Sequence, residues 1–177
     1  VPPPYVAPPP PECDMSNEAN ARVINFIRDN QQAAETLSGE TGLNVDFILA
    51  WAGAESGWGR GSAALRNNNF FGLTTNNWPG AVPCSDGSFA GFACFAVPEG
   101  GTRSLLPSGQ SALSSANGRY LRPALDAQAN GGTAADIARA IANAGFNSEF
   151  NDEGVTYGNN VQGTFNSIQR RLHCLTR

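Results

Sequence analysis

The sequence of 177 residues contains no lysine and only one histidine, and charged residues make up just 15% of it. With a net charge of −4 and no basic cluster, we expect neither nucleic acid nor an anionic membrane surface as a partner. The single histidine, His173, argues against zinc sites built on several histidines and against Ser-His-Asp or Cys-His catalysis. No apolar run approaches the roughly 20 residues that span a bilayer, so membrane insertion is not expected.

The four cysteines contain no CxxC pair, so we expect no metal cluster, no thioredoxin-like motif and no cofactor. Three pairings are possible. We favour Cys84 with Cys94, which closes a glycine-rich hairpin, and Cys13 with Cys174, which ties the two ends of the domain together. Because disulfides persist in oxidising compartments, this pairing favours a periplasmic or extracellular protein. Four buried free thiols in a cytosolic protein are the alternative.

The chain divides into a short segment and one domain. Residues 1–12 hold seven of the twelve prolines, which predicts an extended linker or tail. Residues 13–177 have the length of a single domain with a substantial core.

Helical spacing and capping residues predict that most of this domain is helical. Residues 67–95 differ, because short aromatic pieces alternate there with the turn signals WPG, SDG and AGF. This alternation predicts a small antiparallel β-region, so the expected fold class is α+β and mainly α. The predicted helices cover about residues 17–37, 45–55, 102–116, 120–127, 133–144 and 157–172.

One carboxylate stands on an apolar helix face. Val45, Ile48, Leu49 and Ala52 share one face of the second predicted helix, and Glu55 continues the same stripe near its C-terminus. Burial disfavours the charged carboxylate, and so does the partial negative charge at a helix C-terminus. We therefore expect a raised pKa for Glu55, which suits a general acid. A salt-bridged or solvated helix-end carboxylate is the alternative.

The stretch around this glutamate resembles a known family. ESGWG at residues 55–59, NNNFFGLT at 67–74 and FAVPEG at 95–100 occur in the order found in glycoside hydrolase family 73, the glucosaminidase domains of bacterial autolysins and flagellar peptidoglycan hydrolases. The resemblance implies a lysozyme-like helical domain with a small antiparallel β-lobe. It also implies cleavage of the β-1,4 bond of peptidoglycan glycan strands by an endo-β-N-acetylglucosaminidase, with Glu55 as the catalytic acid.

The groups that would work beside Glu55 are less clearly marked. Trp58 is interpreted as an apolar wall that raises the pKa of Glu55, with core packing as the alternative. Asp86 is the only acid between residues 67 and 95 and is our candidate second carboxylate, although a turn-forming aspartate explains it as well. The family's C-terminal tyrosine motif is altered here, and Tyr157 is the local tyrosine able to replace it.

Three further residues are candidates for binding the sugar. Trp78 lies in a WPG turn, where an exposed ring can stack on a sugar face. Asn69 can hydrogen-bond an N-acetyl group, although asparagine also serves local turns. Phe71 is a candidate contact, with core packing as the alternative reading.

The sequence leaves several functions open. A muramidase and a lytic transglycosylase act on the same polymer, the latter with one glutamate in both steps, and a wall-binding module without turnover is a further alternative. A housekeeping enzyme, a phage lysin and a toxin delivered into a rival's periplasm all fit. In the last case a cognate inhibitor, an immunity protein, would occupy the cleft. We expect a monomer.

Overall fold

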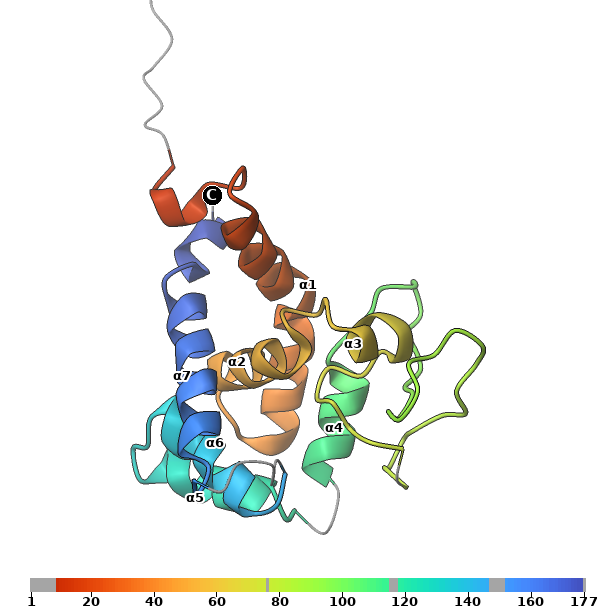
Figure 1. The fold of residues 1–177 in the computed structure, drawn as a ribbon. Coiled ribbons are helices and arrows are strands. Elements are labelled where there is room, and N and C mark those ends of the chain that lie inside the picture. The colour runs from red at the N-terminus through yellow and green to blue at the C-terminus, as the bar shows by residue number, and fades with distance from the viewer. Residues whose placement is uncertain (1–8, 76, 115–117, 147–151, 177) are drawn as a thin grey trace, which may run out of the picture.

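The regular secondary structure is helical throughout the part of the chain that the computed structural model describes, residues 9–75, 77–114, 118–146 and 152–176. Helices α5, α6 and α7 lie on one side of α2, and α3 and α4 lie on the other (Figure 1). The elements are η1 (Pro11–Cys13), α1 (Glu18–Thr41), α2 (Val45–Ser56), α3 (Ser62–Asn67), α4 (Leu106–Ser114), α5 (Leu121–Ala129), α6 (Ala134–Asn143), α7 (Val155–Gln169) and η3 (Leu172–Thr176).

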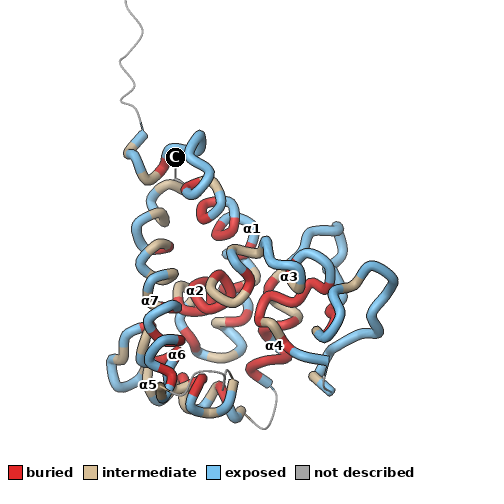
Figure 2. The backbone as a smooth tube through the Cα atoms, in the orientation of Figure 1, coloured by how far each residue is buried: buried red, intermediate tan, exposed pale blue. Residues whose placement is uncertain are grey.

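Helix α2 is the centre of the hydrophobic core. It packs against both α1 and α7, and residues 47–53 are all buried, as the tube in Figure 2 shows. The sequence predicted one buried stripe on this helix. The structure buries it on all sides over those residues, because neighbouring helices cover it from two directions.

Helix starts follow the capping residues in the sequence. The side chain of Asn17 accepts hydrogen bonds from the backbone N–H groups of Ala19 and Asn20, and so begins α1. Thr133 and Asp136 form a capping box at the start of α6, close to the predicted helix start at residue 133.

Two helix boundaries differ from the prediction by four residues, and the other differences are smaller. Helix α1 continues past Gly39 and ends at Gly42, whose left-handed conformation (φ +84°) closes the helix. Helix α4 begins only at Leu106, after Ser104 accepts the Leu106 N–H. Pro107 then occupies the first turn, where its missing N–H leaves no hydrogen bond unmade.

The expected β-lobe is wrong as a description of residues 67–95. In the described part of this segment there is no β-strand, only isolated antiparallel bridges between Thr74 and Phe92 and between Val82 and Cys94. The segment instead forms a set of loops beside α3 and α4 (Figure 1).

Three consecutive asparagines explain how these loops hold together without a sheet. Each buried amide of Asn67, Asn68 and Asn69 both donates to and accepts from backbone groups of the loops. The amides therefore supply the pairing that a strand ladder would otherwise provide. Their backbone partners are Phe89 and Phe92 for Asn67, Ala96 and Ser104 for Asn68, and Leu73 and Ala93 for Asn69.

Two disulfides complete the framework. Cys84–Cys94 closes a loop beside α3, and Cys13–Cys174 joins η1 to η3 across a sequence separation of 161. These are the two pairs that the sequence favoured. None of the helices in the described residues combines the length and the apolar character needed to traverse a bilayer.

Candidate active site

Glu55 lies in the last turn of α2, which ends at Gly57 in the left-handed conformation. Burial raises the pKa of the Glu55 carboxyl to about 7, and a hydrogen bond from Tyr157 acts in the opposite direction. The raised pKa expected from the sequence is therefore present, and burial is its main cause.

The backbone at Gly72 passes directly beside this carboxyl. A Cβ atom added at Gly72 would lie 3.6 Å from Oε2 of Glu55, and the φ of +63° favours glycine at this position. The FFGL part of the sequence motif thus forms one wall of the Glu55 site.

Tyr157 reaches the same carboxyl from α7, 102 positions further along the chain. Its side chain is buried, and its hydroxyl accepts a hydrogen bond of 2.6 Å from Nε1 of Trp51. Because the indole N–H already points at the phenol oxygen, the phenol proton is directed to Glu55. Burial, and then the charge of Glu55, raise the pKa of Tyr157 well above its ordinary value, so the phenol remains a donor.

Aromatic rings surround this hydrogen-bonded group. The Trp51 ring contacts Phe71 with centroids 4.6 Å apart and Phe146 with centroids 5.0 Å apart, both edge to face. Phe146 also lies against Tyr157. These rings account for the apolar environment on the Tyr157 side of the site.

Trp51 was missed by the sequence reasoning, although a signal existed. Trp51 precedes Glu55 by four residues, so the two side chains share one face of α2. The signal was hidden because nearly every residue of this helix is apolar. No property of the sequence alone gives the hydrogen bond from Trp51 to Tyr157.

Trp58 does not form the wall expected from the sequence. Its ring packs edge to face on Phe26, with centroids 5.6 Å apart, and a Cβ added at Gly53 would lie 3.0 Å from it. Gly53 and Glu55 are two residues apart on α2, so they point in nearly opposite directions. Because Trp58 lies over Gly53, it covers the side of α2 away from Glu55.

Two candidate sugar contacts are interior residues. Asn69 is 1% exposed, and its side-chain amide is hydrogen-bonded to backbone groups of Leu73 and Ala93. Phe71 is also 1% exposed and packs on Trp51. In this structure neither side chain is available to a sugar, and both hold the wall that contains Gly72.

Asp86 and Trp78 lie in loops outside the core. Asp86 is exposed in a turn closed by the hydrogen bond from Ser88 N–H to Ser85 O, and Gly87 takes the positive φ that the turn requires. Trp78 is half-buried, and its indole N–H has no hydrogen-bond partner among the described residues.

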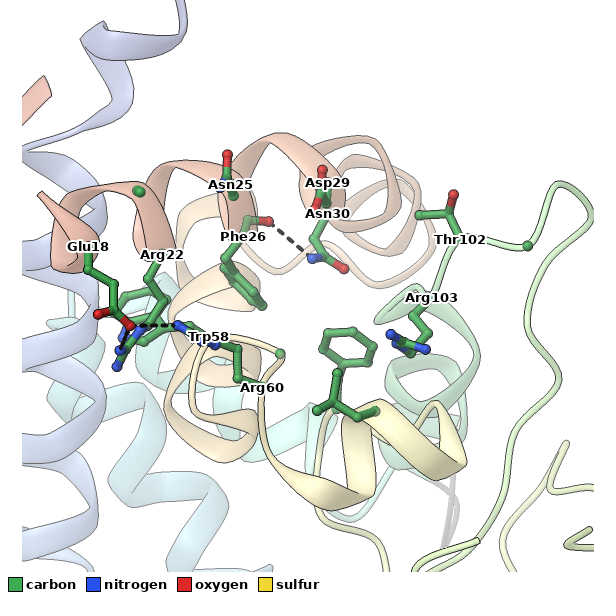
Figure 3. Close-up of a pocket in the computed structure, with 15 residues that line it drawn as sticks. Glu18, Arg22, Asn25, Phe26, Asp29, Asn30, Trp58, Arg60, Thr102 and Arg103 are labelled. Carbon is green, nitrogen blue, oxygen red and sulfur yellow. Dashed lines mark hydrogen bonds and ion pairs between the residues drawn. The ribbon is translucent and has the colours of Figure 1, made fainter. Parts of the chain in front are cut away.

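A separate cleft of about 660 Å³ lies between α1 and the residues that follow α2 (Figure 3). Trp58 and Arg60 line it, and Glu18 holds Arg22 and Arg60 at 3.1 and 3.3 Å. These ion pairs are exposed and contribute little to stability. Glu55 is not among the lining residues, so this cleft is distinct from the Glu55 site.

A half-buried, protonatable glutamate at the end of a central helix is the arrangement of a glycoside hydrolase that uses general acid catalysis. Residues 31–170 match the model of the Glucosaminidase family, described as mannosyl-glycoprotein endo-beta-N-acetylglucosaminidase, and the chain belongs to this family. Membership confirms the family resemblance, and it confirms a glycoside hydrolase of the endo-β-N-acetylglucosaminidase type.

Two solved structures share the fold. One is a type VI secretion system effector-immunity complex from Pseudomonas protegens, with TM-score 0.65 and 20% identity over 88% of this chain and 97% of that one. The other is a C-terminally truncated glycoside hydrolase domain of FlgJ from Salmonella typhimurium, with TM-score 0.52 and 23% identity over 84% of this chain and 98% of that one. No curated protein sequence matches the chain.

Proposed function

We propose that the chain cleaves the β-1,4 bond of peptidoglycan glycan strands as an endo-β-N-acetylglucosaminidase, with Glu55 as the general acid. The observation that carries the proposal is the Glu55 carboxyl, which burial holds at a pKa of about 7 in a chain of the glucosaminidase family. A large fraction of such carboxyls is protonated near neutral pH, so Glu55 can give its proton to the glycosidic oxygen as the bond breaks.

Tyr157 is the second residue of the proposed catalytic site, and it assists the transfer of the Glu55 proton. After the proton has left, Glu55 carries a negative charge in an apolar environment, and the Tyr157 hydroxyl donates to it. The charge develops only as the proton transfers, so this hydrogen bond is stronger in the transition state than in the ground state.

Asp86 and Trp78 are the proposed second carboxylate and sugar contact. Asp86 is exposed in the loop closed by Cys84–Cys94, where its carboxylate is accessible to water and substrate. The half-buried Trp78 offers the exposed part of its ring to a sugar face, whereas its indole nitrogen is buried and has no partner in the described residues.

A lytic transglycosylase is the second candidate. Among the described residues, no carboxylate contributes to the pKa shift of Glu55. This favours a mechanism in which Glu55 acts alone, first as acid and then as base, and releases a 1,6-anhydro sugar.

The setting we propose is the periplasm or the exterior of the cell. The two disulfides support an oxidising compartment. One neighbour in fold is an effector bound to an immunity protein, so we propose that this chain is a delivered toxin, acts as a monomer and is inhibited by a cognate protein occupying the Glu55 site.

Product analysis tests the reaction. Peptidoglycan is digested with the wild-type chain, with Glu55→Gln and with Glu35→Gln, an exposed glutamate of α1 as the matched control. We expect reducing N-acetylglucosamine ends by mass spectrometry from wild type and E35Q only. Equal digestion by E55Q contradicts the role of Glu55, and 1,6-anhydro ends identify the transglycosylase instead.

A second variant tests the proposed role of Asp86 as the second carboxylate. Asp86→Asn abolishes hydrolysis if Asp86 is the second carboxylate. Near-wild-type turnover of D86N rejects that role and leaves the mechanism with Glu55 as the sole acid.

A further inference from the structure

The two ends of the domain bring three metal-ligating side chains together, and a fourth, Glu12, lies beside one of them. Nε2 of His173 lies 3.4 Å from Sγ of Cys13 and 3.9 Å from Sγ of Cys174. Oε1 of Glu12 lies 3.3 Å from the same ring nitrogen. Within the described ranges, Cys13, His173 and Cys174 are the only group of three or more such residues whose ligand atoms all lie within 4.8 Å of one another.

These separations match the edges of a tetrahedral zinc site. With Zn–S bonds of about 2.3 Å and Zn–N or Zn–O bonds of about 2.0–2.2 Å, nitrogen and sulfur ligands stand about 3.6 Å apart, and nitrogen and oxygen ligands about 3.4 Å apart. His173 already holds nearly these distances to both sulfurs and to Glu12. Two changes are needed: the two sulfurs, now bonded to each other, would have to separate to about 3.8 Å, and the Glu12 carboxylate, which is not part of the group of three within 4.8 Å, would have to turn toward them.

The position of the cluster allows a metal to enter. The side chains of His173 and Glu12 are 45% and 37% exposed, whereas Cys13 is buried. The Cα atoms of Cys13 and Cys174 lie 5.4 Å apart, so rotation of the two side chains can separate the sulfurs without moving η1 away from η3.

We propose that, when the Cys13–Cys174 disulfide is reduced, Cys13, Cys174, His173 and Glu12 bind one Zn²⁺ ion. A phosphine reductant supplies the two electrons and becomes the phosphine oxide, with water providing its oxygen and the two thiol protons. Zinc binding then releases both protons to solvent as the thiolates coordinate. Metal and disulfide are thus alternative links between the same two ends of the chain.

The consequence concerns the compartment in which the chain is made. A reducing cytosol keeps cysteines as thiols, and the link between η1 and η3 is then absent. Zinc closes this link in the reducing compartment. In an oxidising compartment a disulfide oxidant accepts the two electrons, becomes a dithiol and re-forms Cys13–Cys174, which releases Zn²⁺. This site could not be predicted from the sequence, because its cysteine ligands are 161 residues apart and no CxxC spacing marks them.

Cobalt binding by the full-length reduced chain tests the proposal. After reduction by a phosphine, one equivalent of Co²⁺ should give thiolate-to-metal charge-transfer bands and the intense visible bands of tetrahedral Co²⁺, and Zn²⁺ should displace it. We expect Cys84→Ser/Cys94→Ser to retain the spectrum, whereas Cys13→Ser/Cys174→Ser should lose it. His173→Ala should weaken Zn²⁺ binding at least tenfold in competition with a chromophoric chelator.

Other outcomes overturn the proposal. These are the absence of a one-to-one complex, an octahedral cobalt spectrum without charge transfer, and undiminished affinity in either the C13S/C174S or the H173A variant. If reduction unfolds the chain, recovery of helical circular dichroism by one equivalent of Zn²⁺ reports the same site. A failure of zinc to restore that signal then counts against it.

Discussion

Nε1 of Trp51 donates a 2.6 Å hydrogen bond to the hydroxyl of Tyr157, and this contact joins the central helix α2 to the last α-helix, α7. Because the phenol oxygen accepts this N–H, the phenol proton is free to be donated to Glu55. The general acid proposed for this enzyme is therefore tuned by two residues, one that donates to Glu55 and one that orients the donor.

Replacing Tyr157 with Phe should move the alkaline limb of the pH–activity profile upward. The tyrosine hydrogen bond lowers the pKa of Glu55, so its loss lets the pKa rise above about 7 and keeps the acid protonated at higher pH. We also expect kcat to fall about 10- to 100-fold, since a hydrogen bond to a charged group contributes about 1.5–3 kcal/mol. A profile with an unchanged alkaline limb would contradict the contact.

Replacing Trp51 with Phe should shift the same limb in the same direction, by a smaller amount. The Tyr157 hydroxyl remains, but it no longer accepts a hydrogen bond from the Trp51 indole. Its orientation is therefore less restricted, and it donates to Glu55 less often. Phe71→Leu is the matched control, because it disturbs the same aromatic packing without removing a hydrogen bond. An equal shift in both variants would indicate a general effect of packing.

Glu55 should make the folded state less stable as the pH rises. Its pKa is about 7 in the folded chain against 4.5 for an ordinary glutamate. Its contribution to the free energy of unfolding is therefore fully present below about pH 4.5 and lost as the pH passes 7, a difference of about 3 kcal/mol. Urea unfolding between pH 4.5 and 8.5 measures this slope. In Glu55→Gln the slope should be much smaller, and an unchanged slope would rule out Glu55 as its source.

Gly72→Ala should impair activity more than its cost in stability explains. The substitution places a methyl group 3.6 Å from Oε2 of Glu55 at a left-handed φ of +63°. Gly131→Ala is a suitable control, because it has a φ of +74° but open space around it. Both variants should lose about 1–2 kcal/mol of stability, and only G72A should lose kcat. Equal kcat values for G72A and G131A would show that the close approach of the Gly72 backbone to Glu55 is not needed for activity.

Asn69→Ala should destabilise the protein by about 2–4 kcal/mol, because it leaves two backbone groups, Leu73 N–H and Ala93 O, without their partner, while Leu73 O keeps the hydrogen bond from Ala93 N–H. The exposed Asn77 provides a control, and Asn77→Ala should change stability by less than about 0.5 kcal/mol. Denaturant midpoints measure both. If N69A retained full stability, the asparagine framework described for these loops would be incorrect.

The sequence was sufficient where the signal is local. The helix start at Thr133 and the position of Glu55 on an apolar helix face depend on residues within a few positions of each other, and both were predicted. The two disulfide pairings were also anticipated, because four cysteines permit few arrangements.

The sequence did not predict two kinds of contact: those between residues far apart in the chain, and backbone hydrogen bonds that side-chain amides make in place of a strand. Aromatic residues among turn signals predict strands, but the buried amides of Asn67 to Asn69 satisfy the same backbone groups without a ladder. Tyr157 was named as a candidate, yet its orientation depends on Trp51, 106 positions away. Spacing along one helix cannot give such a contact, since it is created only when α7 packs on α2.

The Cys13–Cys174 bond also has a mechanical consequence. Segments attached before residue 13 and after residue 174 leave the domain from one corner, where η1 and η3 meet. Tension applied between those attachments passes through a single covalent bond and bypasses the helices. A motor that pulls on both ends would therefore leave the fold intact until that bond is cut.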